Sequence, residues 1–422
     1  MEPRIEQELA RCVRCGACMA VCPVYLASQR EGSVARGKLM TIQAHRDKEL
    51  GLTRRYRELI TSCLLCGSCT QSCPNQVDTA AVVRAARAEL AEKKKLGWFK
   101  RLVLRRILPS RRLLPALLRG ARWCRALWAA KIPQDSGLYI RFSGKEQRRR
   151  IPPIAKRPFL SGDLPEFPAG EGMKVAVFVG CVSNYLRPQA AEATLRVLKD
   201  LGADVWVPKG QGCCGLPAFG AGEVPAARKL AERNLEAFLP AGGPVPDVVT
   251  TPCASCAAML KHHLTELQEN DPRARQLADR VVPFSRLAAN LGGGGDFEGT
   301  ASGPLLTYHD PCHLSRGFGE KDAPRQLLTT LPGARFVEME HPCRCCGHGG
   351  SFNVSHYDLS MAISKRKVES VLASRADLLV TECSGCLLQL AEVLGRQRPG
   401  FEVITTPEAI LRFKFDKPVS PP

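Results

Sequence analysis

The sequence predicts a multidomain protein in which a helical module precedes two copies of an α/β domain. Two four-cysteine runs near the start are related by an offset of 51 residues, and a later set of five cysteines returns at offsets of 130 to 132 residues. Between them, the segment from Lys93 to Arg150 holds 18 Lys and Arg residues against Asp135 and Glu146. A pattern that returns in register indicates duplication, so each half of the chain contains its own repeat.

The first pair of runs predicts two metal clusters. It consists of Cys12, Cys15, Cys18 and Cys22, ending at Pro23, and of Cys63, Cys66, Cys69 and Cys73, ending at Pro74. This CxxCxxCxxxCP spacing is that of bacterial two-cluster ferredoxins, in which the fourth cysteine of each run serves the other cluster. The rule assigns one [4Fe-4S] cluster to Cys12, Cys15, Cys18 and Cys73, and the other to Cys63, Cys66, Cys69 and Cys22. Zinc is the alternative, but zinc motifs pair CxxC units differently.

The surroundings of these runs predict helices. The stretch from Arg36 to Ile60 contains few strand-forming residues. From Thr79 to Lys95, one helical face carries Val82, Val83, Ala86 and Leu90. We therefore expect residues 1–92 to form an α-helical two-cluster ferredoxin module, similar to that of fumarate reductase iron–sulfur subunits.

Residues 93–172 are expected to form a basic amphipathic and proline-rich linker. The Lys93–Arg150 segment supplies +16 of the formal net charge of +19 and interleaves Trp98, Phe99 and Trp123 with its cations. Basic helices with such an apolar face are typical of interfacial membrane segments, and Pro109 and Pro115 are expected to break this one. A connector packed on its neighbours is the open alternative. A nucleic-acid partner is not expected, and Cys124 is expected to be a small buried residue.

The later repeat predicts two domains, 173–300 and 301–422, which we call the CCG copies after Cys213-Cys214-Gly215. Their cysteines are Cys181, Cys213, Cys214, Cys253 and Cys256 in the first copy, and Cys312, Cys345, Cys346, Cys383 and Cys386 in the second. Strands are expected at 174–179, 205–207 and 247–250 and again at 304–308, 336–339 and 378–381, with helices at 190–201, 225–239, 323–331 and 357–374. Each cysteine group follows a strand, where open parallel α/β sheets bind ligands.

Thiolates in this number select zinc, copper(I) or iron–sulfur clusters. Disulfides are disfavoured, because adjacent cysteines accompany a CxxC pair in a chain without a secretory signal. His309 and His348 flank cysteines, so each is either a ligand or a hydrogen-bond donor to sulfur. Cys343 is either a spare ligand or a bystander.

Features that the sequence lacks bear on the location of the protein and on flavin binding. It has no charged leader with an apolar core and no apolar run of about 18 residues, so a cytoplasmic location is expected. It also has no strand-GxGxxG-helix fingerprint, so no flavin is expected on this chain.

Taken together, these motifs resemble a known family across nearly the full length. Six stretches resemble the iron–sulfur subunit of bacterial glycolate oxidase: Cys12–Pro23, Cys63–Pro74, Gly180–Cys181, Gly212–Gly215, His309–Cys312 and Cys345–Phe352. They also resemble related subunits of lactate dehydrogenase complexes, anaerobic glycerol-3-phosphate dehydrogenase and heterodisulfide reductase.

The resemblance implies the iron–sulfur subunit of an oxidoreductase complex. Such a subunit relays electrons from an FAD-containing dehydrogenase subunit for a glycolate- or lactate-type 2-hydroxy acid towards a quinone or another acceptor. The CCG copies would hold one or two further clusters, of cubane or non-cubane type, or zinc. The alternative is a heterodisulfide reductase-like subunit that cleaves a disulfide at these clusters. The basic linker adds the expectation of peripheral attachment to the cytoplasmic face of the inner membrane.

Overall fold

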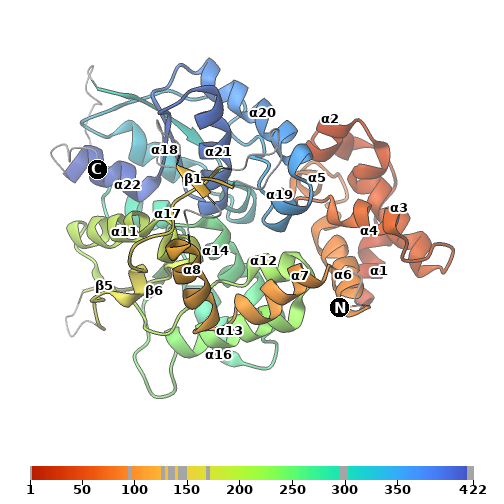
Figure 1. The fold of residues 1–422 in the computed structure, drawn as a ribbon, viewed down its shortest axis with the longest axis horizontal. Helices are drawn as coiled ribbons and strands as arrows, with labels where there is room; N and C mark the ends of the chain where they lie inside the picture. Colours follow the sequence, from red (N-terminus) through yellow and green to blue (C-terminus); the bar gives the residue numbers. More distant parts are fainter. Residues whose placement is uncertain are drawn as a thin grey trace. The chain divides into compact units, whose positions relative to one another are not determined.

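The structure is a computed structural model that describes residues 2–93, 97–124, 129–131, 138–140, 150–167, 172–294 and 303–415. The chain divides into two compact units (Figure 1). The first, here the ferredoxin unit, consists of Met1–Leu108, Gly215–Ala227 and Arg344–Lys367. The second, here the CCG unit, consists of Pro109–Cys214, Arg228–Cys343 and Val368–Pro422.

The N-terminal part of the ferredoxin unit is helical, as the sequence predicts. Its elements are α1 (Glu2–Ala10), η1 (Ala17–Met19), α2 (Pro23–Ser28), η2 (Glu31–Ser33), α3 (Ala35–Arg46), α4 (Arg54–Thr61), α5 (Ser68–Gln71) and α6 (Thr79–Glu92). The predicted apolar face of α6 is buried, and Val82, Val83 and Leu90 pack with Ile42 and Ile60 in one core. Burial of this stripe is what stabilises a helix of this length.

The stretch from Arg36 to Ile60, predicted to be helical, forms two helices. The break between α3 and α4 contains Lys48, whose φ of +63° lies outside the helical region. Thr53 then caps α4, because its Oγ1 accepts a hydrogen bond from the Tyr56 N–H at 3.1 Å. Thr at an N-cap satisfies a donor that the helix itself leaves free, and so it starts a new helix here.

Two segments of the CCG copies belong to the ferredoxin unit. The first contains α12 (Leu216–Gly220), and the second contains α19 (Ser351–Ser355) and the start of α20 (Tyr357–Ala373). Gly222 (φ +86°) lies so close to α6 that an added Cβ would be 2.3 Å from the carbonyl carbon of Arg87. Only glycine permits this approach.

The CCG unit contains the two predicted parallel sheets. The first has the order β5 (Asp204–Trp206), β4 (Lys174–Val177), β6 (Val248–Thr250), and the second has the order β10 (Glu402–Thr405), β9 (Leu378–Thr381), β7 (Leu305–His309), β8 (Arg335–Phe336). All of these pairs are parallel. Strand β8 is shorter than the 336–339 predicted. Where the second copy has β10, the first has a single bridge from Val249 to Val281.

Helices between and after these strands complete the two copies. They are α10 (Gly180–Tyr185), α11 (Pro188–Asp200), α13 (Val224–Phe238), α14 (Ala254–Ala258), η6 (Met259–His263), α15 (Leu264–Leu267), α16 (Pro272–Arg280), α17 (Phe284–Asn290), η7 (His313–Gly317), α18 (Asp322–Thr329), α21 (Ser384–Gln397), α22 (Thr406–Ile410) and η8 (Leu411–Phe415). Both sheets contribute to one core, in which Val175 and Val177 of β4 cluster with Leu306, Tyr308 and Val380 of the second sheet. The two copies therefore share a core.

The basic segment forms short helices. In the ferredoxin unit it contributes α7 (Trp98–Leu102) and the wider turn η3 (Val103–Ile107), and in the CCG unit α8 (Leu113–Trp123). The helix break at Pro109 agrees with the prediction, but Pro115 does not break a helix. It lies in the first turn of α8, where the N–H that proline lacks has no helical partner.

The remainder of the linker is only partly described. Residues 125–128, 132–137 and 141–149, and with them Trp128, lie outside the described residues, whereas β1 (Ala129–Lys131), β2 (Leu138–Ile140) and β3 (Arg150–Ile151) form an antiparallel sheet. The prediction that Cys124 is buried is wrong: its side chain is exposed at the end of α8. Within the described ranges, no helix is both long and apolar enough to cross a membrane.

Candidate metal centres

The two ferredoxin-type loops have the same backbone shape. Arg14 (φ +59°) and Gly16 (φ +88°) in the first loop correspond, 51 residues later, to Leu65 (φ +55°) and Gly67 (φ +72°). Two left-handed residues in each loop curl the backbone around its cysteines. In the second loop, the Leu65 N–H donates to Cys63 Sγ at 3.5 Å. A duplicated loop that donates backbone N–H groups to sulfur fits a thiolate-ligated cluster.

The eight cysteines of these loops fall into two groups of four. One cavity is lined by Cys22, Cys63, Cys66 and Cys69, and another by Cys12, Cys15, Cys18 and Cys73, with Cys69 also at its edge. We call them the Cys63 site and the Cys12 site. Each combines three cysteines of one run with the fourth of the other, as cross-ligation requires. Ligation itself stays a prediction.

Burial differs between the two sites. Cys15 is exposed at the Cys12 site, next to Val13, whose exposed fraction is 67%. At the Cys63 site, burial and the neighbouring Cys66 and Cys63 raise the pKa of Cys69 to about 12. Burial likewise raises the pKa of Cys22. Because a thiol must lose its proton to bind a metal, loading of the Cys63 site is expected to release protons.

In the first CCG copy, all five cysteines lie at one edge of the sheet. Cys181 follows β4 at the start of α10, Cys213 and Cys214 follow β5, and Cys253 and Cys256 follow β6 at the start of α14. Three parallel strands that are neighbours in the sheet place their carboxyl ends side by side. The three loops predicted to hold ligands are therefore brought together.

Contacts between the thiols show how tightly they gather. A hydrogen bond with Cys213 and burial raise the pKa of Cys181, and hydrogen bonds with Cys214 and Cys253 raise that of Cys256. Donation from Cys256 and Cys383 lowers the pKa of Cys253. Gly180 (φ +73°) leaves room here, since an added Cβ would lie 3.2 Å from Cys256 Sγ. A buried donor set made only of sulfur fits an iron–sulfur cluster or zinc.

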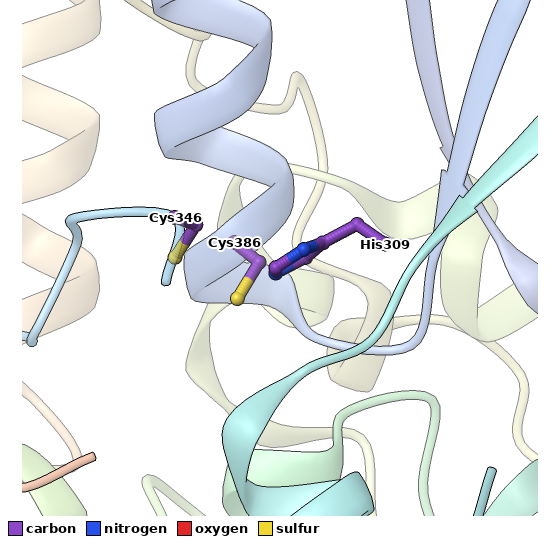
Figure 2. A group of neighbouring side chains, drawn as sticks. All are labelled: His309, Cys346 and Cys386. Atoms are coloured by element: carbon purple, nitrogen blue, oxygen red, sulfur yellow. The ribbon is translucent and has the colours of Figure 1, made fainter. Parts of the chain in front are cut away.

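The second set of five is divided between the two compact units. Cys312 follows β7, and Cys383 and Cys386 stand at the start of α21 after β9, all in the CCG unit. His309, at the end of β7, is buried, and its ring and Cys386 place their ligand atoms within 4.8 Å of each other (Figure 2). At this distance His309 can act either as a ligand or as a hydrogen-bond donor to sulfur, so both predictions stay open. Cys346, the third side chain in Figure 2, belongs to the ferredoxin unit together with Cys345.

Within the ferredoxin unit, the loop of Cys345 and Cys346 lies against the Cys63 site. Hydrogen bonds with Cys346 and Cys66 raise the pKa of Cys345. Around this contact, Val24, Leu64, Phe352 and Ile363 form a small apolar cluster on which Cys22, Cys66 and Cys345 pack. The loop is fixed from behind by Ser364, whose Oγ donates to the Cys346 carbonyl oxygen at 2.7 Å. A predicted CCG ligand thus contacts a predicted ferredoxin ligand.

The remaining candidates have other surroundings. Cys343 Sγ donates to Asp310 Oδ2 at 3.2 Å, and Asp310 also accepts two hydrogen bonds from Arg325, each 3.0 Å long. This carboxylate contact favours the bystander interpretation of Cys343. His348 is half-buried in the ferredoxin unit, where its carbonyl oxygen accepts the Asn353 N–H at 3.0 Å.

Sequence reasoning missed two buried cations at the Cys63 site, Lys38 and Arg87. Each lies on the apolar face of its helix, Lys38 next to Leu39 and Ile42, and Arg87 next to Val83 and Leu90. A charged residue at a core position of an amphipathic helix is the signal that could have identified them.

Family models match both halves of the chain. A model described as "4Fe-4S dicluster domain" matches residues 8–77, and one described as "Cysteine-rich domain", of the CCG type, matches residues 175–261 and 306–391. The N-terminal part is therefore a ferredoxin domain, followed by two CCG domains. A solved structure with the same fold is that of a hypothetical protein from Helicobacter pylori, with a TM-score of 0.51 and 10% identity over 90% of this chain and 68% of that one.

Curated relatives share most of the chain. A "Probable glycolate oxidase iron-sulfur subunit" of Bacillus subtilis (strain 168) is 30% identical over 419 residues, 94% of this chain and 90% of the relative. A subunit of the fumarate reductase (CoM/CoB) of Methanothermobacter marburgensis is 27% identical, covering 93% of this chain and 70% of the relative. A "Lactate utilization protein A 1" of Bacillus anthracis is 29% identical over 244 residues, 57% of this chain and 98% of the relative.

Proposed function

This chain belongs to the family of glycolate oxidase iron–sulfur subunits, and on that premise we propose that it relays electrons from a flavoprotein that oxidises a glycolate- or lactate-type 2-hydroxy acid. Clusters bound at its thiols would supply one-electron transfer. A hydroxy acid gives up two electrons together, so a flavin on a partner subunit is needed to separate them. The electrons would pass to a quinone or another acceptor.

The observation that carries this proposal is the grouping of the thiols. The structure gathers two sets of four cysteines in the ferredoxin unit and a set of five at one edge of the first CCG sheet. We propose that all eight ferredoxin cysteines and all ten CCG cysteines bind metal. We also propose that domain boundaries follow residues 92, 172 and 300. The chain's own residues would hold the clusters, exclude water and set their potentials.

Anaerobic copurification with the neighbouring gene products tests the proposal. We expect iron and acid-labile sulfide in amounts that fill two ferredoxin clusters and at least one CCG site, together with a flavoprotein subunit. Zinc without acid-labile sulfide would contradict the clusters. A stable apo-monomer without a flavoprotein would contradict the relay.

A second candidate function, cleavage of a disulfide, is favoured by one contact. Cys253 of the first CxxC loop and Cys383 of the second lie in hydrogen-bonding contact, and Ser255 Oγ is 3.1 Å from Cys383 Sγ. Two adjacent metal sites could each pass one electron to a single disulfide, which becomes two thiols with two protons from solvent. Reduced protein mixed with a thiol-derived disulfide would release thiol under this candidate and none under the relay alone.

We also propose peripheral binding to an anionic membrane through the basic segment. Its helices expose large apolar side chains: Trp98 (75% exposed), Phe99 and Leu102 in the ferredoxin unit, and Leu113, Leu117 and Trp123 (85% exposed) in the CCG unit. Arg106, Arg112 and Arg119 on the same helices are exposed. Arg105 is not available for lipid, because it pairs with the buried Glu223. Each engaged cation contributes about 1 kcal/mol near anionic lipid.

Flotation with vesicles containing phosphatidylserine tests this proposal. We expect binding at low salt that weakens at high salt, because screening shortens electrostatic reach to ~8 Å at physiological ionic strength. A variant with Arg106, Arg112 and Arg119 changed to Glu should not float. The matched control changes the same number of exposed arginines elsewhere, Arg55, Arg228 and Arg275, and should float. Equal behaviour of the two variants would identify the segment as a connector.

A further inference from the structure

Two positively charged side chains are buried at one of the two ferredoxin sites. Lys38 of α3 is 2% exposed and lines the same cavity as Cys22, Cys63, Cys66 and Cys69. Its Nζ donates to the carbonyl oxygen of Ser33. Burial lowers the pKa of Lys38, and the nearby Cys63 and Cys22 oppose that shift. Lys38 is therefore tied to Ser33 and lies near two of the four cysteines that line the cavity.

Arg87 of α6 contacts the loop that carries Cys63. It is 6% exposed, and its guanidinium donates to the carbonyl oxygens of Thr61 at 3.1 Å and Cys63 at 2.6 Å. Further bonds reach the carbonyl oxygens of Ile60 at 3.1 Å and Gly220 at 2.6 Å. Arg87 therefore fixes the loop that carries Cys63 while placing a full charge beside it.

Neither cation has a carboxylate partner in the part of the chain that the structure describes. Burying an unpaired charge is costly, and proteins rarely do so without a counter-charge. Thiolates bound to a cluster supply such a negative charge at this position, and the negative charge grows when the cluster accepts an electron. The two cations thus fit the reduced form of a cluster better than the oxidised form.

The Cys12 site has different electrostatics. The cations that line it are Arg14, which is exposed, and Arg36, which already pairs with Glu31. Solvent at the exposed Cys15 further screens any charge there. The first loop also has Ala17 where the second has Ser68, whose Oγ lies 3.4 Å from Cys66 Sγ. Hydrogen bonds to sulfur and positive charge both raise a cluster's reduction potential.

We propose that Lys38 and Arg87 make the Cys63 site the higher-potential of the two ferredoxin sites, so that an electron reaching the ferredoxin unit is held next to Cys345 and not at the exposed Cys15 end. Burial alone acts in the opposite direction, because it disfavours the more negative reduced state. Two whole charges in a poorly screened interior outweigh that effect. This inference rests on the proposed function, since it requires clusters at both sites.

Redox titration of the full-length protein, purified anaerobically with its clusters and followed by electron paramagnetic resonance, tests the inference. Signals are assigned with Cys15→Ser and Cys66→Ser. In the wild type, the Cys63-site signal should appear first on reduction. Lys38→Met removes the charge but keeps the chain length, and should lower the reduced-to-oxidised ratio of this site at least tenfold at fixed potential, about 59 mV for one electron. The Cys12-site signal should not move.

Controls separate charge from packing. Lys38→Arg keeps the charge and should restore the wild-type order. Lys48→Met removes an exposed lysine of the same unit and should shift neither signal. Ser68→Ala should lower the potential of the Cys63 site by less than Lys38→Met does. Arg87→Met is less informative, because four carbonyl groups would lose their donor.

The outcomes distinguish the inference from the proposed function. Absence of both ferredoxin signals from protein purified with its metal would overturn the relay itself. If both signals are present and the Cys12 site reduces first in the wild type, the inference is wrong while the relay stands. That comparison uses the wild-type protein alone, so it tests the inference even if Lys38→Met does not fold. An equal shift of both sites in Lys38→Met would also contradict it.

Discussion

The two CCG copies carry the same five cysteines but place one pair differently. In the first copy, Cys213 and Cys214 belong to the CCG unit, where Asn234 holds their loop. In the second copy, Cys345 and Cys346 belong to the ferredoxin unit, where Cys345 contacts Cys66. The cysteine spacing is thus repeated, while the two adjacent-cysteine loops have different neighbours. We therefore expect the two copies to respond differently when matched residues are changed.

Replacement of matched cysteines should have the largest effect. Cys213→Ser and Cys345→Ser, 132 residues apart, should each remove one CCG centre and lower the iron content accordingly. Because Cys345 contacts Cys66, only Cys345→Ser should also change the resonance of the Cys63 site. The measurement is iron analysis together with electron paramagnetic resonance. Cys343→Ser, at a thiol bonded to Asp310, should change neither. Identical spectra from the two matched variants would remove the distinction between the copies.

Glycine substitutions should have the next largest effect, because residues 215–227 and 344–367 pack in different ways on the rest of the ferredoxin unit. The first-copy segment is residues 215–227 and the second-copy segment residues 344–367. An alanine at Gly222 in the first-copy segment would place its Cβ 2.3 Å from the backbone of Arg87. At Gly349 in the second, the nearest atom is Leu64 Cδ2 at 2.5 Å, the end of a side chain that can move. We expect Gly222→Ala to cost about 3 kcal/mol of stability or more, as overpacking and positive φ combine.

Thermal unfolding of the holoprotein would measure this difference. Gly349→Ala should be less harmful than Gly222→Ala. The control is Gly202→Ala, with φ +83° and no atom within 4 Å of the added Cβ, which should cost only about 1–2 kcal/mol from backbone strain. If Gly222→Ala and Gly202→Ala unfold at the same temperature, close backbone packing on α6 is not what holds residues 215–227 in place.

The two residues behind the adjacent cysteines should show a smaller effect. Asn234 accepts from the Gly212 N–H and donates to the Cys213 carbonyl oxygen, both at 3.0 Å, whereas Ser364 serves Cys346 with a single bond. Asn234→Ala leaves two buried groups without a side-chain partner, at about 1–3 kcal/mol each, and Ser364→Ala leaves one. Asn234→Ala should therefore release iron at a lower guanidinium concentration than Ser364→Ala does. Equal midpoints would mean that both loops are held by other contacts.

Local pattern predicted much of this architecture. The apolar face of α6 and the alternation of strands and helices in each copy are set by neighbours in sequence, and both appear as predicted. The position of the cysteines after β4, β5 and β6 follows from the geometry of parallel sheets. The grouping of three cysteines of one run with the fourth of the other was also predictable, because the spacing is that of two-cluster ferredoxins.

Other features depend on contacts distant in sequence. The apolar faces of α3 and α6 mark Lys38 and Arg87 as core positions, but their place at the Cys63 site depends on how the two helices pack. The contact of Cys345 with Cys66 joins residues far apart in the chain. The prediction that Pro115 breaks the helix was wrong for a simpler reason. Pro115 lies in the first turn of α8, where a helix tolerates proline.

The smallest expected effect is a pH dependence confined to the second-copy segment. His356 Nε2 lies 3.1 Å from Thr61 Oγ1, and burial lowers the pKa of His356, with Arg87, Lys100 and Lys38 adding to the shift and Glu58 opposing it. The unfolded segment therefore gains a proton near pH 6.5, while the folded one does not until lower pH. Stability of this segment should fall as pH drops below about 6.5 and then level off.

Amide hydrogen exchange at pH 7.5 and 5.5, corrected for the intrinsic rate, would measure this dependence. Protection of residues 344–367 should decrease at pH 5.5, whereas residues 215–227 should not change, because the residue 132 positions before His356 is Val224, which does not titrate. His356→Gln keeps a hydrogen-bonding side chain and should abolish the dependence. A decrease of equal size in both segments would point to a general acid effect on the ferredoxin unit. The contrast between the two CCG copies would then not extend to their response to pH.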